Sequence, residues 1–322
     1  MRFDARSARS RSVVVALGGN ALAPPDEPAT ITDQFGHARA SVAPIVDLAR
    51  DGWHLAIVHG NGPQVGDELV RGEVARDVVE PMPLGVLVAA TAGWIGYMLQ
   101  QSLENGLALA RVDRPVVMMM TQTLIDADDP HLVQPTKPIG LALSDEQAEV
   151  LRGLDVPIGR DGSGRCRRLA PSPTPIGIVE AECVHGLVQR GVIVIAAGGG
   201  GPPVVRSAGG GLEGREAVVD KDRVAALLAL DLDAEALIIL TNVEAVFRGW
   251  GTPDARPIRR MALAEAQALV AAGEFDEGGM QPKVEAAIDF VSAGGGRAVI
   301  AHLDDGPAAL RGEAGTTIQR SL

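Results

Sequence analysis

Six short, continuous apolar runs recur along this chain, and they constrain its fold more than any other feature. The runs are Val13–Leu17, Leu55–Val58, Val116–Met120, Val192–Ala196, Leu237–Leu240 and Ala298–Ala301. Apolar residues recur at helical spacing between some of them, from about Asp33 to Arg50 and from about Leu84 to Gly106. Apolar strands that alternate with helices are typical of a mainly parallel sheet covered on both faces. The pattern therefore predicts an α/β fold.

Glycine-rich turns follow three of these runs. They are Gly18-Gly19-Asn20-Ala21, His59-Gly60-Asn61-Gly62 and the four glycines Gly198–Gly201. Glycine permits positive φ and lets backbone N–H groups approach an anion without a Cβ in the way. One such turn is more often only structural. Three of them at the carboxyl edge of one sheet, where open α/β sheets bind ligands, predict an anion-binding site.

The alternation of strands and helices lapses between about Ile125 and Pro175. This stretch is rich in proline, glycine and aspartate, and it contains Asp128-Asp129-Pro130 and Pro171-Ser172-Pro173. We interpret it as an inserted subdomain, or lid, that packs over the site. A long surface excursion is the alternative.

Lysine occurs only three times, at Lys137, Lys221 and Lys283, although lysine and arginine together number 29. Codon drift towards arginine is the simple explanation. The lysines that survive such drift should be those that arginine cannot replace, and a compact ammonium group suits contact with a transferring phosphoryl group. The count therefore makes the three lysines candidates for a functional site.

The neighbours of the three lysines support this interpretation. Lys137 lies in a predicted rigid loop between Pro135 and Pro138. Lys221 lies between Asp220 and Asp222, at a predicted strand-to-helix junction. Lys283 follows Pro282, which we place at the first position of a helix, where N–H groups and the helix dipole favour anions.

Composition and missing motifs exclude several other functions. The net charge of −12 argues against a nucleic-acid or anionic-membrane surface, and the apolar stretch Val86–Leu99 is too short to span a membrane. Residues 1–12 lack the apolar core of a signal peptide and predict a flexible tail, while Cys166 and Cys183 show no metal or redox spacing. These features predict a reduced, cytoplasmic protein.

Familiar catalytic motifs are missing as well. The sequence contains no GxxxxGK[ST], HExxH or GxSxG motif, and its first glycine turn does not fit GxGxxG. Glycine turns, three lysines and two aspartates remain. This is the kind of site that phosphoryl transfer uses, because the reaction depends on alignment and on charge neutralisation.

Over nearly its whole length the sequence resembles the carbamate kinases, a branch of the amino acid kinase family. The matching stretches are Val14–Leu22, His59–Gly66, Pro135–Gly140, Ile195–Gly201, Glu216–Asp222, Gly251–Pro253 and Met280–Ala287. The resemblance implies a three-layer αβα sandwich with a mainly parallel sheet and a protruding inserted subdomain. It also implies an acceptor and phosphoryl lobe over 13–215, with a lid at about 125–175, and a nucleotide lobe over 216–322.

The activity implied by the resemblance is ATP + carbamate ⇌ ADP + carbamoyl phosphate with Mg²⁺, run towards ATP in arginine and carbamoyl phosphate catabolism by a homodimer. The implied catalytic residues are Lys137, Lys221, Lys283 and Asp222, with assistance from Asp220. The implied acceptor and phosphoryl residues are Gly18, Gly19, Asn20, Gly60, Asn61, Gly62, Gly199 and Gly200. The implied nucleotide residues are Thr241, Asn242, Val243, Phe247, Trp250, Gly278, Gly279 and Met280. No residue is assigned as a metal ligand, and ordinary packing is the alternative for Trp250.

The sequence departs from the family pattern at four positions. Gly85 replaces an aspartate and Ala92 a glutamine, Thr174 stands where lysine is common, and Gly279 stands where serine is common. None of these changes removes a predicted phosphate-binding lysine. The first two leave open a related phosphotransferase with another small carboxylate or carbamoyl acceptor. A non-catalytic nucleotide-binding homologue is a separate alternative.

Overall fold

A computed structural model describes residues 11–19, 22–24, 30–161, 164–276 and 279–322. Residues 1–10 of the predicted tail, and the predicted site residues Asn20 and Gly278, lie outside the described residues. No helix in the described ranges has both the length and the apolar character that a membrane crossing requires.

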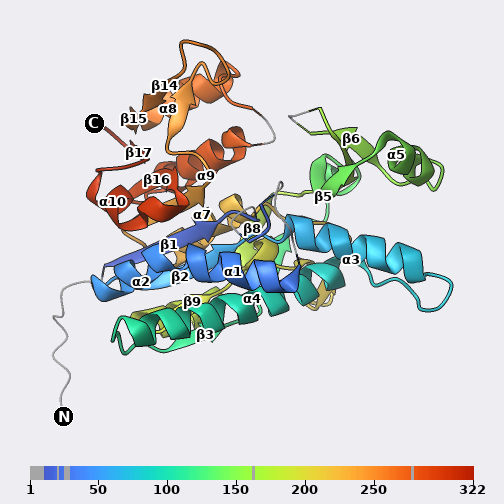
Figure 1. Cartoon of the computed structure of the whole chain (residues 1–322), viewed down its shortest axis with the longest axis horizontal. Coiled ribbons are helices and arrows are strands. Elements are labelled where there is room, and N and C mark those ends of the chain that lie inside the picture. The colour runs from blue at the N-terminus through green and yellow to red at the C-terminus, as the bar shows by residue number, and fades with distance from the viewer. Residues whose placement is uncertain (1–10, 20–21, 25–29, 162–163, 277–278) are drawn as a thin grey trace.

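All six apolar runs lie in one eight-stranded sheet (Figure 1). Six neighbouring strands are parallel, whereas β17 is antiparallel to β16 and β15 follows the direction of β17. In sheet order the strands are β15 (Arg260–Ala262), β17 (Thr316–Gln319), β16 (Arg297–His302), β12 (Ala236–Thr241), β1 (Ser12–Leu17), β2 (His54–His59), β9 (Ile193–Ile195) and β3 (Val116–Met118). The sheet crosses the predicted lobe boundary near residue 215 without a break, since β1 pairs with β12.

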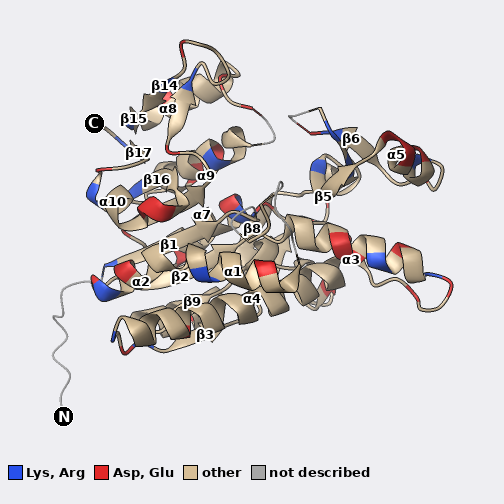
Figure 2. Ribbon diagram, viewed as in Figure 1, with Lys and Arg blue, Asp and Glu red and all other residues tan. Residues whose placement is uncertain are grey.

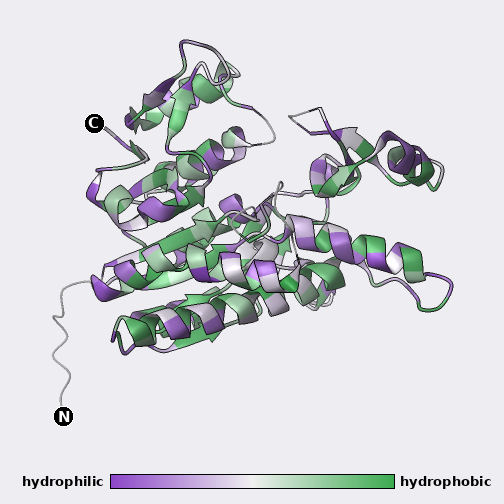
Figure 3. Cartoon of the chain, viewed as in Figure 1, coloured by the Kyte–Doolittle hydropathy of each residue, from purple (hydrophilic) through white to green (hydrophobic). Residues whose placement is uncertain are grey.

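Helices cover both faces of this sheet. One face packs against α1 (Ile31–Ser41), α2 (Ala43–Arg50), α4 (Leu84–Leu109) and α10 (Gly306–Arg311). The other face packs against α6 (Ala181–Gln189), α7 (Lys221–Asp231), α8 (Leu263–Ala271) and α9 (Met280–Ser292). The central strands are mostly hydrophobic, whereas the helices mix hydrophobic and hydrophilic positions (Figure 3). The predicted three-layer αβα sandwich is confirmed.

Local sequence explains where several helices differ from their predicted limits. The helix predicted from Asp33 to Arg50 is two helices, because the chain turns at Val42 and Pro44 lies in the first turn of α2. Pro282 does not open its helix as predicted. The helix α9 begins at Met280, and Pro282 occupies the third position, where its missing N–H still breaks no helical hydrogen bond.

The insertion leaves the sandwich between β4 (Thr123–Ile125) and β8 (Pro175–Ile178). It forms a lid consisting of the short helix η2 (Pro130–Leu132), β5 (Lys137–Leu143), α5 (Asp145–Arg152), β6 (Ile158–Arg160) and β7 (Cys166–Ala170). The order of its sheet is β5-β7-β6, and the lid projects from the body beyond α3 (Gly62–Ala75), as Figure 1 shows. Lys137 is the first residue of β5 and pairs with Ala170, so it lies in a strand and not in the predicted loop.

Three smaller features complete the fold. The strands β10 (Pro203–Arg206) and β11 (Leu212–Gly214) join β4 and β8 in a four-stranded sheet. A hairpin of β13 (Val246–Arg248) and β14 (Arg256–Ile258) lies beyond β12. Short helices η3 (Gly198–Gly200) and η4 (Leu303–Asp305) follow β9 and β16.

Candidate active site

The three glycine turns meet at the carboxyl ends of β1, β2 and β9. A Cβ on Gly60 would lie 2.8 Å from the backbone nitrogen of Gly19, so the first two turns touch. Gly199 has φ +67°, and a Cβ there would lie 2.1 Å from the side-chain nitrogen of Asn61. Side chains larger than glycine at these two positions would separate the turns. Among the described residues, the three turns therefore form the predicted cradle of backbone groups; Asn20 lies outside these residues.

The helix α3 starts in the middle of this cradle. Its N-cap residue, Asn61, does not cap the helix through its side chain. Instead, the buried Asn61 amide donates a 2.9 Å hydrogen bond to Oγ1 of Thr91 on α4. The first backbone N–H groups of α3 therefore have no side-chain cap, and the positive end of the helix dipole faces the cradle. Such a helix start favours a bound anion.

Two of the three lysines share one aspartate beside the cradle. Nζ of Lys221 lies 2.5 Å from Oδ1 of Asp222, and Nζ of Lys283 lies 3.1 Å from its Oδ2. Asp222 is buried, and the two ammonium groups approach it from α7 and α9. A Cβ on Gly60 would lie 3.1 Å from Cδ of Lys221, so the lysine stem packs against the second glycine turn. The structure thus joins two charged residues and one turn that are distant in sequence.

The third lysine reaches the same place from the lid. Acidic and basic residues are spread over both the body and the lid (Figure 2). Lys137 on β5 forms an ion pair with Oδ2 of Asp220, the N-cap residue of α7. The five charged residues predicted from the sequence therefore form one cluster. It contains three ammonium groups and two carboxylates, so it carries a net positive charge at the edge of a protein whose overall charge is −12. Such a cluster is suited to an anionic ligand.

Burial and charge oppose one another in this cluster. Burial alone would raise the pKa of Asp220, but the ammonium groups of Lys137, Lys221 and Lys283 outweigh it and lower that pKa. The pKa of Asp222 is lowered for the same reason, against burial, by Lys221 and Lys283. Burial dominates at Lys221, whose pKa is lowered, whereas Asp222 and Asp220 outweigh burial at Lys283 and raise its pKa. Both aspartates are therefore ionised at neutral pH.

A buried histidine supports the second glycine turn. His59 is 1% exposed, and complete burial lowers its pKa to about 4. Its Nδ1 lies 3.1 Å from the carbonyl oxygen of Gly60, and its ring lies against Gly198 of the third turn. The nearby Lys221 further disfavours a charged imidazole. His59 is therefore neutral at pH 7, and it contacts both the second and the third glycine turn.

The predicted nucleotide residues lie in two places. Thr241 ends β12, next to β1 in the sheet, so Thr241 and Asn242 lie at the same edge as the glycine turns. Met280 opens α9 one turn before Lys283. Phe247 and Trp250 belong to the β13 hairpin, where their ring centroids are 5.1 Å apart and Trp250 is 60% exposed. Trp250 thus presents much of its ring to solvent, which ordinary core packing would not do.

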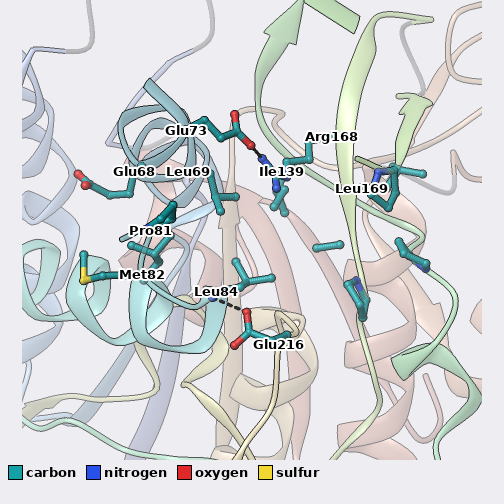
Figure 4. Close-up of a pocket in the computed structure, with 16 residues that line it drawn as sticks. Glu68, Leu69, Glu73, Pro81, Met82, Leu84, Ile139, Arg168, Leu169 and Glu216 are labelled. Carbon is teal, nitrogen blue, oxygen red and sulfur yellow. Dashed lines mark hydrogen bonds and ion pairs between the residues drawn. The ribbon is translucent and has the colours of Figure 1, made fainter. Parts of the chain in front are cut away.

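A separate groove of about 420 Å³ lies at the base of the lid and includes none of the three lysines. It is lined mainly by apolar residues of α3, the start of α4 and the lid, and Figure 4 shows its polar ends. Arg168 of β7 pairs with Glu73 of α3 at one end, and Glu216 accepts a 2.6 Å hydrogen bond from the N–H of Leu84 at the other (Figure 4). The groove therefore marks the junction between lid and body, and it is distinct from the cluster.

Residues 11–302 match the amino acid kinase family. The chain belongs to the amino acid kinase family. The carbamate kinase of Halobacterium salinarum is 45% identical over 307 residues, which cover 95% of this chain and 97% of that protein. A carbamate kinase-like protein of Escherichia coli, YqeA, is 39% identical over 96% of this chain and 99% of its own length.

Solved structures of this family agree with the fold. Carbamate kinase from Giardia lamblia bound to citric acid has a TM-score of 0.91 and 34% identity over 97% of this chain and 99% of that one. The same enzyme bound to AMP-PNP has a TM-score of 0.87, with 34% identity and the same coverage of both chains. The protruding lid and the mainly parallel sheet are therefore features of an amino acid kinase fold.

The structure shows what surrounds two of the departures from the family pattern. A Cβ on Gly85, in the first turn of α4, would lie 2.9 Å from the carbonyl oxygen of Arg215. Glu216, the neighbour of Arg215, places its carboxylate at the start of the same helix. A carboxylate therefore still faces the dipole of α4, although Gly85 has none. Ala92 is buried, and its Cβ lies 2.9 Å from the Cβ position built on Gly198.

Three residues of this region were not predicted from the sequence. Thr91 accepts a hydrogen bond from the side-chain amide of Asn61. The carboxylate of Asp276 accepts a hydrogen bond from the N–H of Met280 at the start of α9. Gly66 of α3 lies against Gly140 of β5 so closely that a Cβ on Gly66 would lie 1.9 Å from Cα of Gly140. Only the last left a sequence signal, since both glycines belong to stretches that carry the family resemblance.

Proposed function

We propose that this chain is a carbamate kinase, which transfers a phosphoryl group reversibly between ATP and carbamate. The observation that carries the proposal is the meeting of Lys137, Lys221 and Lys283 with Asp220 and Asp222 beside three glycine turns. The relatives that cover nearly its full length, and that are named carbamate kinases, support the choice of acceptor.

The geometry suggests that backbone groups bind the substrates and that the lysines neutralise charge. The N–H groups at the start of α3 and in the glycine turns hold the acceptor and the phosphoryl group. The three lysines neutralise the charge that spreads over the phosphoryl oxygens in the transition state. Asp222 orients Lys221 and Lys283 through its two oxygens. Carbamate is already an anion, so the reaction needs alignment and charge neutralisation and no general base.

Mg²⁺ is expected to accompany the nucleotide. The described residues include no group of three His, Cys, Asp or Glu side chains placed to hold a metal ion, and Asp220 and Asp222 each face an ammonium group. Magnesium in kinases is commonly held by substrate phosphates with few protein ligands, and this site fits that arrangement. When bound with ATP, Mg²⁺ would neutralise charge on the phosphates; we assign it no protein ligand.

We propose that the nucleotide binds on the side of β12 and α9. Thr241, Asn242 and Val243 follow β12, and Gly279 and Met280 open α9 beside Lys283. We propose that the base lies near Phe247 and the exposed face of Trp250, because aromatic rings bind flat bases by stacking. The segment from 216 to 322 would then supply the nucleotide site, and the segment from 13 to 215 the acceptor site and the lid.

The cellular setting follows from the same proposal. Cys166 and Cys183 are both free, which suits a reducing, cytoplasmic environment. We propose a homodimer that makes ATP from carbamoyl phosphate during arginine catabolism. This direction and this assembly are what the family resemblance suggests.

The decisive experiment measures ATP formation from ADP and carbamoyl phosphate by wild type and by Lys137→Ala. We expect robust wild-type activity and a loss of about a hundredfold or more in kcat in the variant, because one transition-state cation is removed. An inactive wild type that still binds ATP would contradict the proposal.

One observation favours a second candidate for the acceptor. Gly85 and Ala92, both on α4, depart from the carbamate kinase pattern, and Ala92 directly follows Thr91, which accepts the Asn61 amide. The alternative is a phosphotransferase of the same fold that uses another small carboxylate or carbamoyl compound. ATP hydrolysis coupled to a panel of such acceptors, compared with carbamate, distinguishes the two. A purely nucleotide-binding homologue is disfavoured because all three lysines are present and face one site.

A further inference from the structure

Asp220 makes contacts that belong to two different parts of the molecule. Its Oδ1 accepts the N–H groups of Asp222 at 2.9 Å and of Arg223 at 3.3 Å, which caps α7. Its Oδ2 accepts a hydrogen bond from Nζ of Lys137 on the lid. A single carboxylate therefore connects the first turn of a core helix to the lid strand β5.

Among the three lysines, only Lys137 forms a direct ion pair with Asp220, although Lys221 and Lys283 also act on its charge from farther away. Lys221 and Lys283 divide the two oxygens of Asp222 between them. Lys137 comes from a different part of the chain and finds its charge partner in Asp220. The side chain of Asp220 is 13% exposed and that of Lys137 36%, so solvent screens this pair in part.

The lid is also held to the body at other points, including a 3.0 Å hydrogen bond from the N–H of Val218 to the carbonyl oxygen of Pro171. Gly66 and Gly140 pack backbone to backbone where α3 crosses β5. Arg168 of the lid pairs with Glu73, near the far end of α3. These contacts fix the base of the lid, whereas the Lys137–Asp220 contact fixes the end of β5 that faces the phosphoryl site.

We propose that Asp220 is a positioning residue for Lys137: it docks the lid lysine over the start of α7 in the substrate-free protein and releases the ammonium group to the phosphoryl oxygens when substrate binds. This proposal rests on the proposed phosphotransferase function. Asp220 itself does not contact the reacting atoms. Closing the lid and placing the third cation then become a single event, and the cap on α7 keeps the carboxylate at a fixed position for it.

The competing explanation is that Asp220 serves only as a helix cap. The variant Asp220→Asn separates the two roles, because an asparagine amide oxygen caps a helix about as well as aspartate but carries no charge for Lys137. Asp220→Ala removes both roles. Glu213→Gln is the matched control, since it removes one negative charge from an exposed side chain close to Asp220 in sequence.

Two measurements test the proposal. In hydrogen exchange of the substrate-free protein, Asp220→Asn should speed exchange at Lys137–Leu143 and Cys166–Ala170, and Lys137→Ala should do the same. In steady-state kinetics, Asp220→Asn should lower kcat about tenfold or more and change the KM for the nucleotide less than about threefold. The double variant should be no slower than Lys137→Ala alone, because both changes remove the same placement of the ammonium group.

Wild-type kcat and wild-type exchange in Asp220→Asn would overturn the proposal and leave the capping role. A loss of kcat that is equally large in the Lys137→Ala background, with unchanged exchange, would also overturn it. Glu213→Gln should match wild type in both measurements. If the wild type fails to make ATP, the proposed function fails, and the exchange measurement still decides whether Asp220 holds the lid.

Discussion

The two lysines on the core helices and the lysine on the lid reach the same site in different ways. Lys221 and Lys283 are 13% and 17% exposed and share the buried Asp222, whereas Lys137 is 36% exposed and pairs with Asp220. Lys221 and Lys283 form the core pair, and the helices that carry them, α7 and α9, pack within one hydrophobic cluster on one face of the sheet. The strand that carries Lys137 belongs to a separate three-stranded sheet.

From this difference we expect the core side of the site to be more rigid than the lid side. A buried ion triad on packed helices has little freedom, because displacing one charge leaves the others unpaired in a poorly solvated place. A lysine on a protruding sheet can be withdrawn without exposing the core. We infer that the core pair forms a fixed phosphate platform and that the lid supplies the third cation.

Removing the carboxylate that serves the core pair should have the greatest consequence. Asp222→Ala leaves two buried ammonium groups facing each other, and we expect a loss of about 3–5 kcal/mol in the free energy of unfolding together with a loss of nearly all activity. Urea unfolding and the ATP-formation assay measure the two effects. Asp222→Asn, which keeps the shape, should be destabilised less. A fully stable Asp222→Ala would show that the core pair is not held as we describe.

Blocking the lid crossing should impair catalysis without unfolding the body. In Gly66→Ala the new Cβ would lie 1.9 Å from Cα of Gly140, so β5 must move away from α3 and carry Lys137 with it. We expect kcat to fall by about tenfold to a hundredfold with a smaller change in the KM for ATP. Gly72→Ala on the same helix is the control, because its Cβ would meet no atom closer than 3.4 Å. Equal kinetics in the two variants would mean that the lid does not need this crossing.

The support beneath the glycine turns should make the core side of the site sensitive to acid. The folded-state pKa of His59 is lowered to about 4, so the unfolded protein binds a proton that the folded protein rejects as pH falls below the ordinary value near 6.5. His59 should therefore cost the folded state about 2 kcal/mol between about pH 7.5 and pH 5. His59→Asn should lack this part of the acid dependence in urea unfolding followed across that range. An identical pH dependence in both proteins would show that His59 is not buried in the neutral form.

The sequence was most informative where the chemistry is local. Each apolar run became a strand of the central sheet, because a strand buried on both faces must be apolar at every position. The lysine count singled out three residues that the structure brings into one cluster, and their functional role stays a prediction. Predictions failed where neighbours in space decided the outcome. Lys137 lies in a strand because β7 pairs with it, and the predicted long helix breaks at Val42.

The sequence by itself therefore determined the α/β class, the glycine turns and the identity of the three lysines. Only the tertiary structure decided which lysine pairs with which aspartate, because that depends on how α7, α9 and the lid pack around one edge of the sheet. Adjacent residues in Asp220-Lys221-Asp222 have different partners, since Asp220 caps the helix and faces the lid while Asp222 faces α9. A helix start turns successive side chains in different directions, and no linear pattern specifies what lies in each of them.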